Sequence, residues 1–354
     1  MIPHNKPYIN KNSYKIIKSV IKSGWINYST ISHEVEDKLS NLLYQKSNKV
    51  NLVINGTSAL FLALKALNIK TNDEVIIPSY TCTALLNAIN LIGAKAIIAD
   101  VSRENLSFSV DLLQQYISNK TKAIILVHTF GIPCELGDIQ KFKIPIIEDC
   151  SQALGSRFND GSLVGSKGDI SVFSFYATKL ITGGVGGAIA SQNKNILEFI
   201  QDYLNFDCPK TYKSRFNFQI SDINSSMILA SLNNLETVLK KKRKIANSYL
   251  KVISSQYANI IGANHYRFLI EFNTKEALLS CQKYLISVGI KTIIPIENYE
   301  LLHRYLNLNS DDYPNSEYLS KCILSIPIFV NLNKSEIKHI QRSLHDYFSS
   351  SASV

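Results

Sequence analysis

The first half of the chain alternates short apolar runs, rich in β-branched residues, with segments whose apolar residues recur at helical spacing. The runs that predict strands are residues 50–54, 74–77, 95–99, 123–127, 144–147, 170–175 and 187–191. Helices are predicted between them at residues 58–67, 83–92, 110–117 and 135–142. Strands that alternate with helices are typical of a mainly parallel sheet that is covered on both faces.

The pattern changes after residue 221. A long helical stretch at residues 221–250 leads to predicted strands at 267–272 and 290–294 and to predicted helices at 275–288 and 334–348. Strands this few and this widely spaced predict a smaller α+β domain. We therefore expect an α/β protein with a large domain, residues 1–240 including an N-terminal arm, and a small C-terminal domain, residues 241–354.

The composition is that of an ordinary globular protein, with 45% hydrophobic and 19% charged residues among 354. No apolar run approaches the roughly 18–20 residues that a membrane helix needs. The first residues, Met1 to Lys6, lack the apolar stretch of a signal peptide. The sequence thus predicts a soluble cytoplasmic protein without membrane insertion.

The formal net charge is +10, and the densest basic run is Lys240–Lys244 within the predicted helix at 221–250. Such a run is usually a solvated helix surface, and this is the favoured interpretation. Because a run on one helix points in every direction around it, some of these side chains must turn toward the protein. A positive field would suit an anionic small-molecule substrate, whereas nucleic-acid binding is the weaker interpretation.

The six cysteines are scattered, and no Cys-x-x-Cys pair occurs. This spacing matches neither a zinc ribbon nor a disulfide framework. We expect reduced and mostly buried thiols. The positions are Cys82, Cys134, Cys150, Cys208, Cys281 and Cys322.

The first motif that can carry chemistry is Asn55–Leu60, which joins a predicted strand to a predicted helix. Free backbone N–H groups at a helix start can cradle a phosphate, and Gly56 would permit a close approach. The hydroxyl groups of Thr57 and Ser58 would add donors. The alternative is plain capping of the helix by these hydroxyl groups.

The second motif is the acidic pair Glu148 and Asp149, at the carboxyl end of the apolar strand at 144–147. Open α/β sheets place ligand-binding residues at this end. Such an acidic residue could bind a metal, cap a helix or hold a cationic ring nitrogen. We find no histidine or cysteine at metal-ligand spacing around it, so we expect no metal.

The third motif is Lys179, which follows the strand at 170–175 and precedes the glycine-rich segment Gly183–Gly187. An isolated lysine is usually exposed, but glycines could let the backbone close around a bulky group beside this one. A desolvated lysine is suited to act as a nucleophile. The glycine segment precedes a strand and does not fit Gly-x-Gly-x-x-Gly, which disfavours a dinucleotide site.

A phosphate cradle, a strand-end aspartate and a loop lysine, in this order, together describe a pyridoxal phosphate (PLP) site. Covalent attachment to a lysine, with a carboxylate on the pyridine nitrogen, is the combination that PLP chemistry requires. The sequence therefore predicts Lys179 as the cofactor lysine and Asp149 as the partner of the ring nitrogen.

With these motifs in place, the sequence resembles the DegT/DnrJ/EryC1/StrS family of sugar aminotransferases, which have the PLP-dependent transferase fold type I (aspartate-aminotransferase-like). The resemblance covers nearly the whole chain. Its motifs are Ser23–Trp25, Asn55–Leu60, Asp73–Ser79, Gly93–Lys95, Val127-His128, Glu148-Asp149, Gly168–Ile170, Phe173–Phe175, Thr178-Lys179 and Leu324–Pro327.

The resemblance implies a role for each residue of the site. Lys179 holds the cofactor and later moves protons, Asp149 binds the pyridine nitrogen, and Gln152 approaches the phenolic oxygen. The phosphate is bound by Thr57, Ser58 and Ser174, next to Gly56. Asn217 reaches the phosphate of the neighbouring subunit, so the resemblance also implies a homodimer with shared active sites.

Three positions depart from the family pattern. Cys82 stands where relatives carry an aromatic residue that stacks on the pyridine ring, and Tyr80 need not point inward to replace it. Gln219 stands where relatives carry an arginine. Residues 292–306, a region where sugar-contacting residues vary, match poorly.

The function that the resemblance implies is transfer of an amino group, from an amino acid that we expect to be L-glutamate, to a keto carbon of a nucleotide-linked (deoxy)sugar. A PLP-dependent sugar dehydratase is one alternative, but those relatives carry histidine at the lysine position, which Lys179 argues against. A non-catalytic regulatory or binding protein with this fold is another alternative, which the complete set of Lys179 and Asp149 disfavours.

Overall fold

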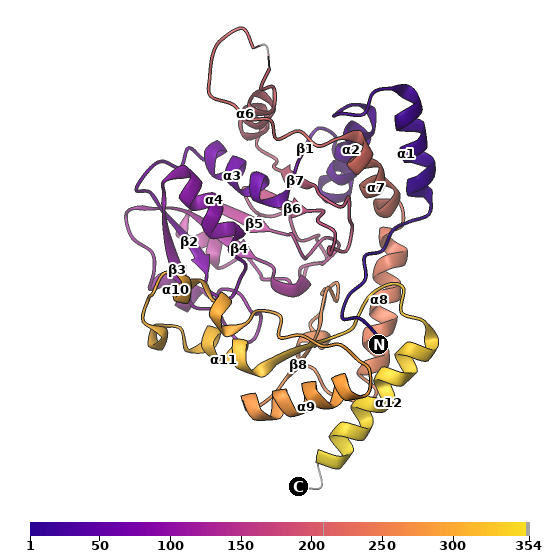
Figure 1. The fold of residues 1–354 in the computed structure, drawn as a ribbon. Coiled ribbons are helices and arrows are strands. Elements are labelled where there is room, and N and C mark those ends of the chain that lie inside the picture. The colour runs from indigo at the N-terminus through magenta and orange to yellow at the C-terminus, as the bar shows by residue number, and fades with distance from the viewer. Residues whose placement is uncertain (208, 352–354) are drawn as a thin grey trace.

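The computed structural model describes residues 1–207 and 209–351, and its centre is a seven-stranded sheet (Figure 1). The strand order is β1-β7-β6-β5-β4-β2-β3. The strands are β1 (Val50–Val53), β2 (Glu74–Pro78), β3 (Lys95–Ala99), β4 (Thr121–Val127), β5 (Ile146–Asp149), β6 (Ile170–Ser174) and β7 (Gly187–Ala190).

The direction of the strands brings the predicted motifs to one edge of the sheet. Strands β3, β2, β4, β5 and β6 pair in parallel, whereas β7 is antiparallel to both β6 and β1. Strand β1 therefore runs in the same direction as β6, and every strand except β7 ends at the same edge. The motifs that follow β1, β5 and β6 meet there, as ligand-binding residues do in open α/β sheets.

Helices cover both faces of the sheet because the strands alternate their buried side chains. On β4, Ile124 and Leu126 join the core on one face, and Ile125 joins the core on the other. The first core includes residues of α2 and α7, and the second includes residues of α3, α4 and α6. These helices are α2 (Thr30–Tyr44), α3 (Gly56–Ala66), α4 (Ala84–Ile92), α6 (Lys194–Leu204) and α7 (Asp222–Leu232).

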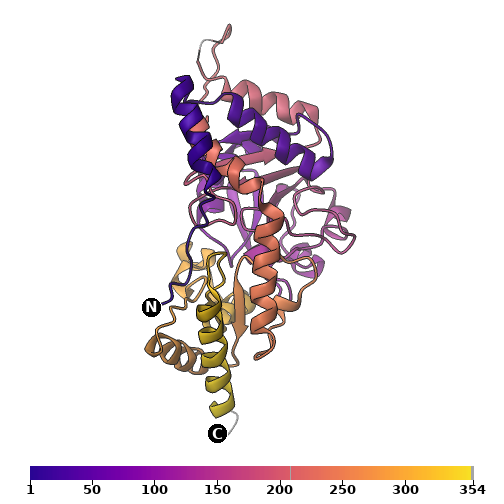
Figure 2. The same ribbon diagram turned by 90° about the vertical axis from the view of Figure 1, so that its right-hand side faces the viewer.

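A smaller unit follows the sheet along the chain and lies below it in Figures 1 and 2. Its two strands pair antiparallel and pack with helices around a separate hydrophobic core. Its elements are α8 (Leu235–Tyr249), β8 (Phe268–Glu271), α9 (Lys275–Ser287), α11 (Pro314–Cys322), β9 (Ile323–Ile326) and α12 (Lys334–Ser351). The remaining elements are α1 (Asn12–Ser23), α5 (Val110–Gln114), α10 (Leu302–Tyr305) and short 3-10 turns at Thr129–Gly131, Ile139–Phe142, Tyr257–Asn259, Asn298–Glu300 and Ser310–Asp312.

Helix α8 connects the two cores (Figure 2). Its first turns place Leu235 and Val238 in the core beneath the large sheet, and its later turns place Ile245 and Tyr249 in the small core. The expected domain boundary near residue 240 stays a prediction, and this change of core within α8 is consistent with it.

The structure confirms the α/β architecture with a mainly parallel sheet, but three local expectations are wrong. The expected helix at 135–142 is only a 3-10 turn at Ile139–Phe142. The helical stretch at 221–250 is two helices, α7 and α8, separated at Asn233 and Asn234. The expected strand at 290–294 makes only isolated bridges, from Ile290 to Ile2 and from Ile293 to Ser325. Ile293 exchanges both backbone hydrogen bonds with Ser325 of β9, but the residues around Ile293 do not continue this pairing as a strand.

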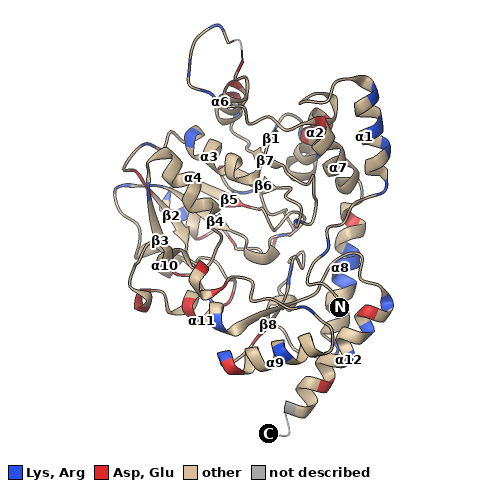
Figure 3. Ribbon diagram, viewed as in Figure 1, with Lys and Arg blue, Asp and Glu red and all other residues tan. Residues whose placement is uncertain are grey.

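The basic run on α8 behaves as its helical position requires. Lys242 is buried, and its four neighbours in the run are exposed at the helix surface. Figure 3 shows lysine and arginine positions on α1, α8, α9 and α12, with acidic positions also on the last three of these helices. In the described part of the chain, no helix is long and apolar enough to cross a membrane.

Four of the cysteines, Cys134, Cys150, Cys281 and Cys322, are free and buried as expected. Cys82 is also free but exposed. Cys208 lies outside the described residues.

Candidate active site

A cavity of about 220 Å³ lies at the edge of the sheet where the strands β1, β2, β4, β5 and β6 end. Seven of the nine residues that the sequence predicts for the site line this cavity: Gly56, Thr57, Cys82, Asp149, Gln152, Ser174 and Lys179. Ser58 and Asn217 do not line it. The structure therefore assembles one site from segments that are up to 123 residues apart in the sequence, the separation of Gly56 and Lys179.

The start of α3 forms one wall of the cavity. The side chain of Asn55 caps this helix by accepting a hydrogen bond from the backbone N–H of Ser58 at 2.8 Å. The cap is thus neither Thr57 nor Ser58, and the alternative of plain capping by these hydroxyl groups is wrong. Thr57 is exposed to the cavity, whereas Ser58 is buried beside the helix start and does not line it.

Gly56 allows α3 to begin very close to the end of β6. A Cβ atom at Gly56 would lie 3.1 Å from Cβ of Ser174 and 3.4 Å from its hydroxyl oxygen. The free N–H end of α3 and the hydroxyl of Ser174 are consequently close together, which is the arrangement that binds a phosphate at a helix start.

The glycine-rich segment 183–187 has a different role from the one expected. A Cβ atom at Gly187 would lie 2.4 Å from the carbonyl oxygen of Asn55, and one at Gly183 would lie 2.6 Å from the carbonyl oxygen of Val185. None of these glycines lines the cavity. The segment closes on the protein itself, against the residue that caps α3, rather than around a bulky ligand.

Asp149 is the last residue of β5, and it is buried at the base of the cavity. Its Oδ1 atom accepts a hydrogen bond from the backbone N–H of Ser151 at 2.9 Å. Its Oδ2 atom has no hydrogen bond within the described residues, so it can accept one from a cationic ligand group.

The neighbour of Asp149 on β5, Glu148, organises the loop behind the site. Its carboxylate accepts hydrogen bonds from the backbone N–H groups of Gly165, Lys167 and Gly168 and lies 3.0 Å from Nε2 of His128. Burial raises the pKa of Glu148, but the hydrogen bonds from His128 and the backbone outweigh it, so the pKa is lowered overall. Glu148 therefore stays charged behind the site.

His128, singled out in the sequence only as part of a family motif, lines the cavity, and its contact with Glu148 across 20 positions was not predicted. Its Nδ1 atom accepts the backbone N–H of Cys134 at 3.1 Å, which makes Nε2 the protonated atom that donates to Glu148. His128, Glu148 and Cys150 bring potential metal-ligand atoms within 4.8 Å of one another, contrary to the argument from spacing. Each of these groups already has a hydrogen-bond partner, and burial raises the pKa of the Cys150 thiol.

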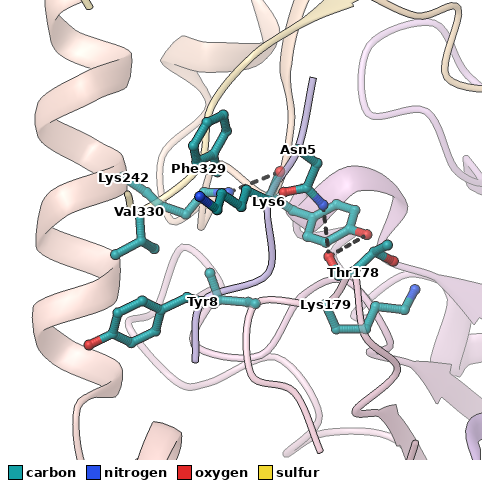
Figure 4. Close-up of a pocket in the computed structure, with 10 residues that line it drawn as sticks. Asn5, Lys6, Tyr8, Thr178, Lys179, Lys242, Phe329 and Val330 are labelled. Atoms are coloured by element: carbon teal, nitrogen blue, oxygen red, sulfur yellow. Dashed lines mark hydrogen bonds between the residues drawn. The ribbon is translucent and has the colours of Figure 1, made fainter. Parts of the chain in front are cut away.

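Lys179 lies in the loop after β6, where its backbone N–H donates to the carbonyl of Tyr176 at 2.9 Å. Its side chain lines the main cavity and also a smaller one, shown in Figure 4. Its Nζ atom lies 5.6 Å from the ring centre of Tyr266, which precedes β8 of the small unit. The lysine is thus placed between the two units.

Cys82 and Tyr80 have different surroundings in the structure. Cys82 is exposed and lines the cavity, so it does not point into the core. Tyr80 is fully buried and packs edge-on against Phe130, with ring centres 6.0 Å apart. Tyr80 therefore does not supply the stacking ring that this sequence lacks at position 82.

The remaining positions singled out in the sequence are also placed. The Oε1 atom of Gln152 accepts the backbone N–H of Phe130 at 2.8 Å, which orients this side chain at the cavity wall. Asn217 is exposed, and its Oδ1 atom accepts the backbone N–H of Gln219 at 3.1 Å. Thr81, Ser151 and Tyr176 also line the cavity, although no sequence signal singled them out.

Three comparisons with known proteins describe what this chain resembles. It matches the profile of the DegT/DnrJ/EryC1/StrS aminotransferase family over residues 7–345. The GDP-perosamine synthase of Escherichia coli O157:H7 is 29% identical over an alignment of 367 residues, gaps included, which covers 98% of this chain and 99% of that protein. The GDP-perosamine synthase of Vibrio cholerae is 33% identical over 259 residues, which cover 70% of each chain.

Among solved structures, a Streptococcus pneumoniae protein assigned as a sugar aminotransferase, in its PMP form, superposes with a TM-score of 0.90. It is 23% identical, and the superposition covers 99% of this chain and 98% of that chain. These findings confirm the family resemblance, the type I fold and the expectation of PLP as cofactor. The roles of individual residues stay predictions.

Proposed function

This chain belongs to the DegT/DnrJ/EryC1/StrS aminotransferase family, and from this premise we propose that it moves an amino group from an amino acid to a keto carbon of a nucleotide-linked sugar. The observation that carries the proposal is the convergence of Thr57, Asp149, Ser174 and Lys179 on one cavity. We propose L-glutamate as the amino donor. A cytoplasmic location belongs to the same proposal and rests on the sequence.

The residues of the cavity fit PLP. The start of α3 with Thr57 and Ser174 would bind the phosphate, since Gly56 brings the helix against Ser174. The free Oδ2 atom of Asp149 would accept a hydrogen bond from the protonated ring nitrogen. Lys179 would hold the cofactor covalently. When bound, the cofactor supplies an electron sink next to the carbon that loses its proton.

The chain's own residues would carry the proton transfers. Lys179 would remove the proton from the α-carbon of the donor as a general base, and in the reverse direction it would return a proton to the sugar carbon as a general acid. Asp149, held by the N–H of Ser151, would keep a proton on the ring nitrogen. Gln152, oriented by Phe130, would donate a hydrogen bond from its amide to the phenolic oxygen.

Two observations support a nucleotide-linked substrate. Two of the curated relatives that match this chain are named GDP-perosamine synthase, and that name contains a nucleotide. The net charge of +10 would attract a diphosphate. Lys179 disfavours the dehydratase alternative, in which this position is histidine.

A single-turnover experiment tests the proposal. The enzyme is first charged with amine by L-glutamate, and then mixed with a panel of nucleotide-linked ketosugars and, as a control, with the same sugars without nucleotide. We expect an aminated sugar from at least one nucleotide-linked substrate, detected by mass spectrometry. Amination of the free sugars alone, or of none of the panel, would contradict the proposed substrate class.

We further propose that the active unit is a homodimer with shared sites. Asn217 is exposed and lies outside the cavity of its own chain, as a residue that serves a partner's site would. Large apolar side chains are exposed in the segment that precedes it and in the N-terminal arm, including Trp25, Tyr212 and Phe216. Exposed apolar groups of this kind are typical of an interaction surface.

Mixing two inactive variants tests the shared site. Asn217→Ala and Lys179→Ala homodimers are each expected to be impaired. Co-expressed, they should form heterodimers with one intact site, made of Lys179 from one subunit and Asn217 from the other, so activity should reappear. Activity of the tagged and purified heterodimer is the measurement. A fully active monomer, or a heterodimer without activity, would contradict the shared site.

A ring at position 82 is expected to strengthen cofactor binding. Cys82 lines the cavity and is exposed, so Cys82→Phe has room to stack on the pyridine ring. A stacked ring contributes about 0.5–1.5 kcal/mol, and we therefore expect cofactor affinity to rise by up to about tenfold. Titration of the apoenzyme with PLP measures it. A lower melting temperature of the apoenzyme with unchanged affinity would contradict the expectation.

A further inference from the structure

Arg267, which directly precedes β8, is a partly buried guanidinium without a counter-ion. No carboxylate of the described residues forms an ion pair with it, and its Nε atom is buried without a hydrogen-bond partner. The one side-chain contact of its NH groups is Nη1 to Nε2 of His4, at 3.5 Å. By contrast, Arg103, Arg215 and Arg304 each have a carboxylate partner.

The groups around Arg267 do not compensate its charge. Burial, followed by the charges of Arg267 and Lys242, lowers the pKa of His4 to about 3, so this imidazole is neutral near pH 7. Lys242 is buried nearby and donates from Nζ to the carbonyls of Tyr266 and Ile328, each at 3.0 Å. Burial lowers the pKa of Arg267 itself. A buried charge without a partner destabilises a fold, so this arrangement favours the binding of an anion.

The position of Arg267 relates it to the reactive lysine. The Cζ atom of Arg267 and the Nζ atom of Lys179 each lie 5.6 Å from the ring centre of Tyr266. Arg267 also lies 5.4 Å from the ring of Phe130, whose backbone N–H holds Gln152 at the cavity wall. Figure 4 shows the smaller cavity, which Tyr266 also lines; Lys179 and Lys242 reach it from different segments of the chain, and Asn5 and Lys6 reach it from the N-terminal segment.

We propose that Arg267 is the receptor for a carboxylate of the amino donor. This inference rests on the proposed function and deepens it, because it assigns the group that recognises an amino acid. The amine of the donor must reach the cofactor where Lys179 would hold it. The carboxylate of the donor then extends toward Arg267, whose guanidinium lies near the ring of Tyr266, as Lys179 does. A guanidinium binds a carboxylate with two parallel hydrogen bonds, and the unpartnered Nε atom is one of the donors such a pair uses.

The diphosphate of the sugar substrate is another anion that could use a guanidinium. Lys242 already donates to two carbonyl groups, so Arg267 alone is free to pair with an anion, and its one charge matches one carboxylate better than a diphosphate. The two half-reactions separate these sources, because the donor reacts in the first and the nucleotide-linked sugar in the second. Each half-reaction is followed by the absorbance of the bound cofactor.

The main test replaces Arg267 with methionine in the PLP-loaded enzyme. We expect Arg267→Met to weaken the donor half-reaction by raising its KM roughly 10- to 100-fold, with the sugar half-reaction unchanged. Arg267→Lys keeps the positive charge but loses the paired N–H donors, so its KM for the amino donor should lie between those of the wild type and Arg267→Met. Arg103→Gln is the matched control, because Arg103 is an arginine of the same region that already has Glu271 as partner. It should leave both half-reactions unchanged.

Thermal stability separates a receptor from a structural arginine. Since Arg267 is unpaired, Arg267→Met should not lower the melting temperature of the holoenzyme. Glutarate, a dicarboxylate without an amine, should raise the melting temperature of the wild type and of Arg103→Gln but not that of Arg267→Met. This second measurement needs no turnover.

The possible results are distinguishable. An unchanged donor KM in Arg267→Met, or a weakened sugar half-reaction instead, would overturn the inference while the proposed function stands. A lower melting temperature that Arg267→Lys restores without restoring the donor KM would show a structural arginine and would also overturn it. If the wild type reacts with no amino donor, the proposed function fails, and the shift by glutarate still decides whether Arg267 binds a carboxylate.

Discussion

Lys179→Ala is expected to abolish amino transfer, with a loss of turnover of roughly 10³-fold or more, because one side chain supplies both the covalent attachment and the proton transfers. Alanine removes the amine and leaves the cavity walls unchanged. Thr57, Ser174 and the start of α3 remain in place, so PLP should still bind non-covalently, only more weakly. Turnover with the best sugar of the panel measures the first effect, and equilibrium dialysis of PLP the second.

The attachment itself can be located directly. Reduction of the PLP-loaded wild type with borohydride, followed by peptide mass spectrometry, should find the cofactor on Lys179. Lys244→Ala is the matched control, since Lys244 is an exposed lysine of α8 and should leave labelling and turnover unchanged. Label on any lysine other than Lys179 would remove the central claim about this site.

Asp149→Asn is expected to reduce kcat by roughly 10²–10³-fold, in the range seen when one stabilising group is removed from an active site. Asparagine keeps the shape and can still accept the N–H of Ser151, but it loses the negative charge. An opposite charge favours the protonated form of a ring nitrogen. Its removal should therefore lower the pKa of the bound cofactor's ring nitrogen and weaken the electron sink.

Two measurements check the effect of Asp149→Asn. Steady-state kinetics give kcat, and the absorbance of the bound cofactor as a function of pH reports the change in its protonation. Asp346→Asn is the control, because Asp346 is an exposed carboxylate of α12 in the small unit and does not line the cavity. Unchanged kcat in Asp149→Asn would show that this carboxylate does not serve the ring nitrogen.

The sequence predicted the strands and the positions of the site because both depend on local patterns. The strands β2, β3 and β4 follow apolar runs, and the motifs at Gly56, Asp149 and Lys179 follow strands that end at one edge. In a parallel sheet, residues that follow successive strands meet whatever their separation in sequence. The order of the strands and motifs along the chain was therefore sufficient to predict that the motifs lie close together at one edge of the sheet.

Other features depend on tertiary contacts that no local pattern records. The hydrogen bond between His128, which follows β4, and Glu148 of β5 joins residues that are distant in the sequence. With Cys150 they bring potential metal-ligand atoms together where the sequence spacing indicated no metal site. The glycine-rich segment 183–187 packs against the backbone of Asn55, where a side chain at Gly187 would clash, and Asn55 lies more than a hundred residues earlier. The exposure of Cys82 likewise depended on the cavity around it.

The basic residues show the same limit. Lys242 has four basic neighbours, and its burial follows from the packing of α8 against the small unit. Arg267 gave no sequence signal, since a lone arginine before a strand is ordinary. Its significance rests on the missing carboxylate, which only the folded chain reveals.

The place of β7 in the sheet has a consequence for folding during synthesis on the ribosome. Strand β1 is made early, but its only partner in the sheet is β7, which ends at Ala190. Until β7 has left the exit tunnel, β1 has no partner in the sheet that would fix the start of α3 beside Ser174. The phosphate site can therefore form only after more than half of the chain has been synthesised, so the growing chain acquires its cofactor late.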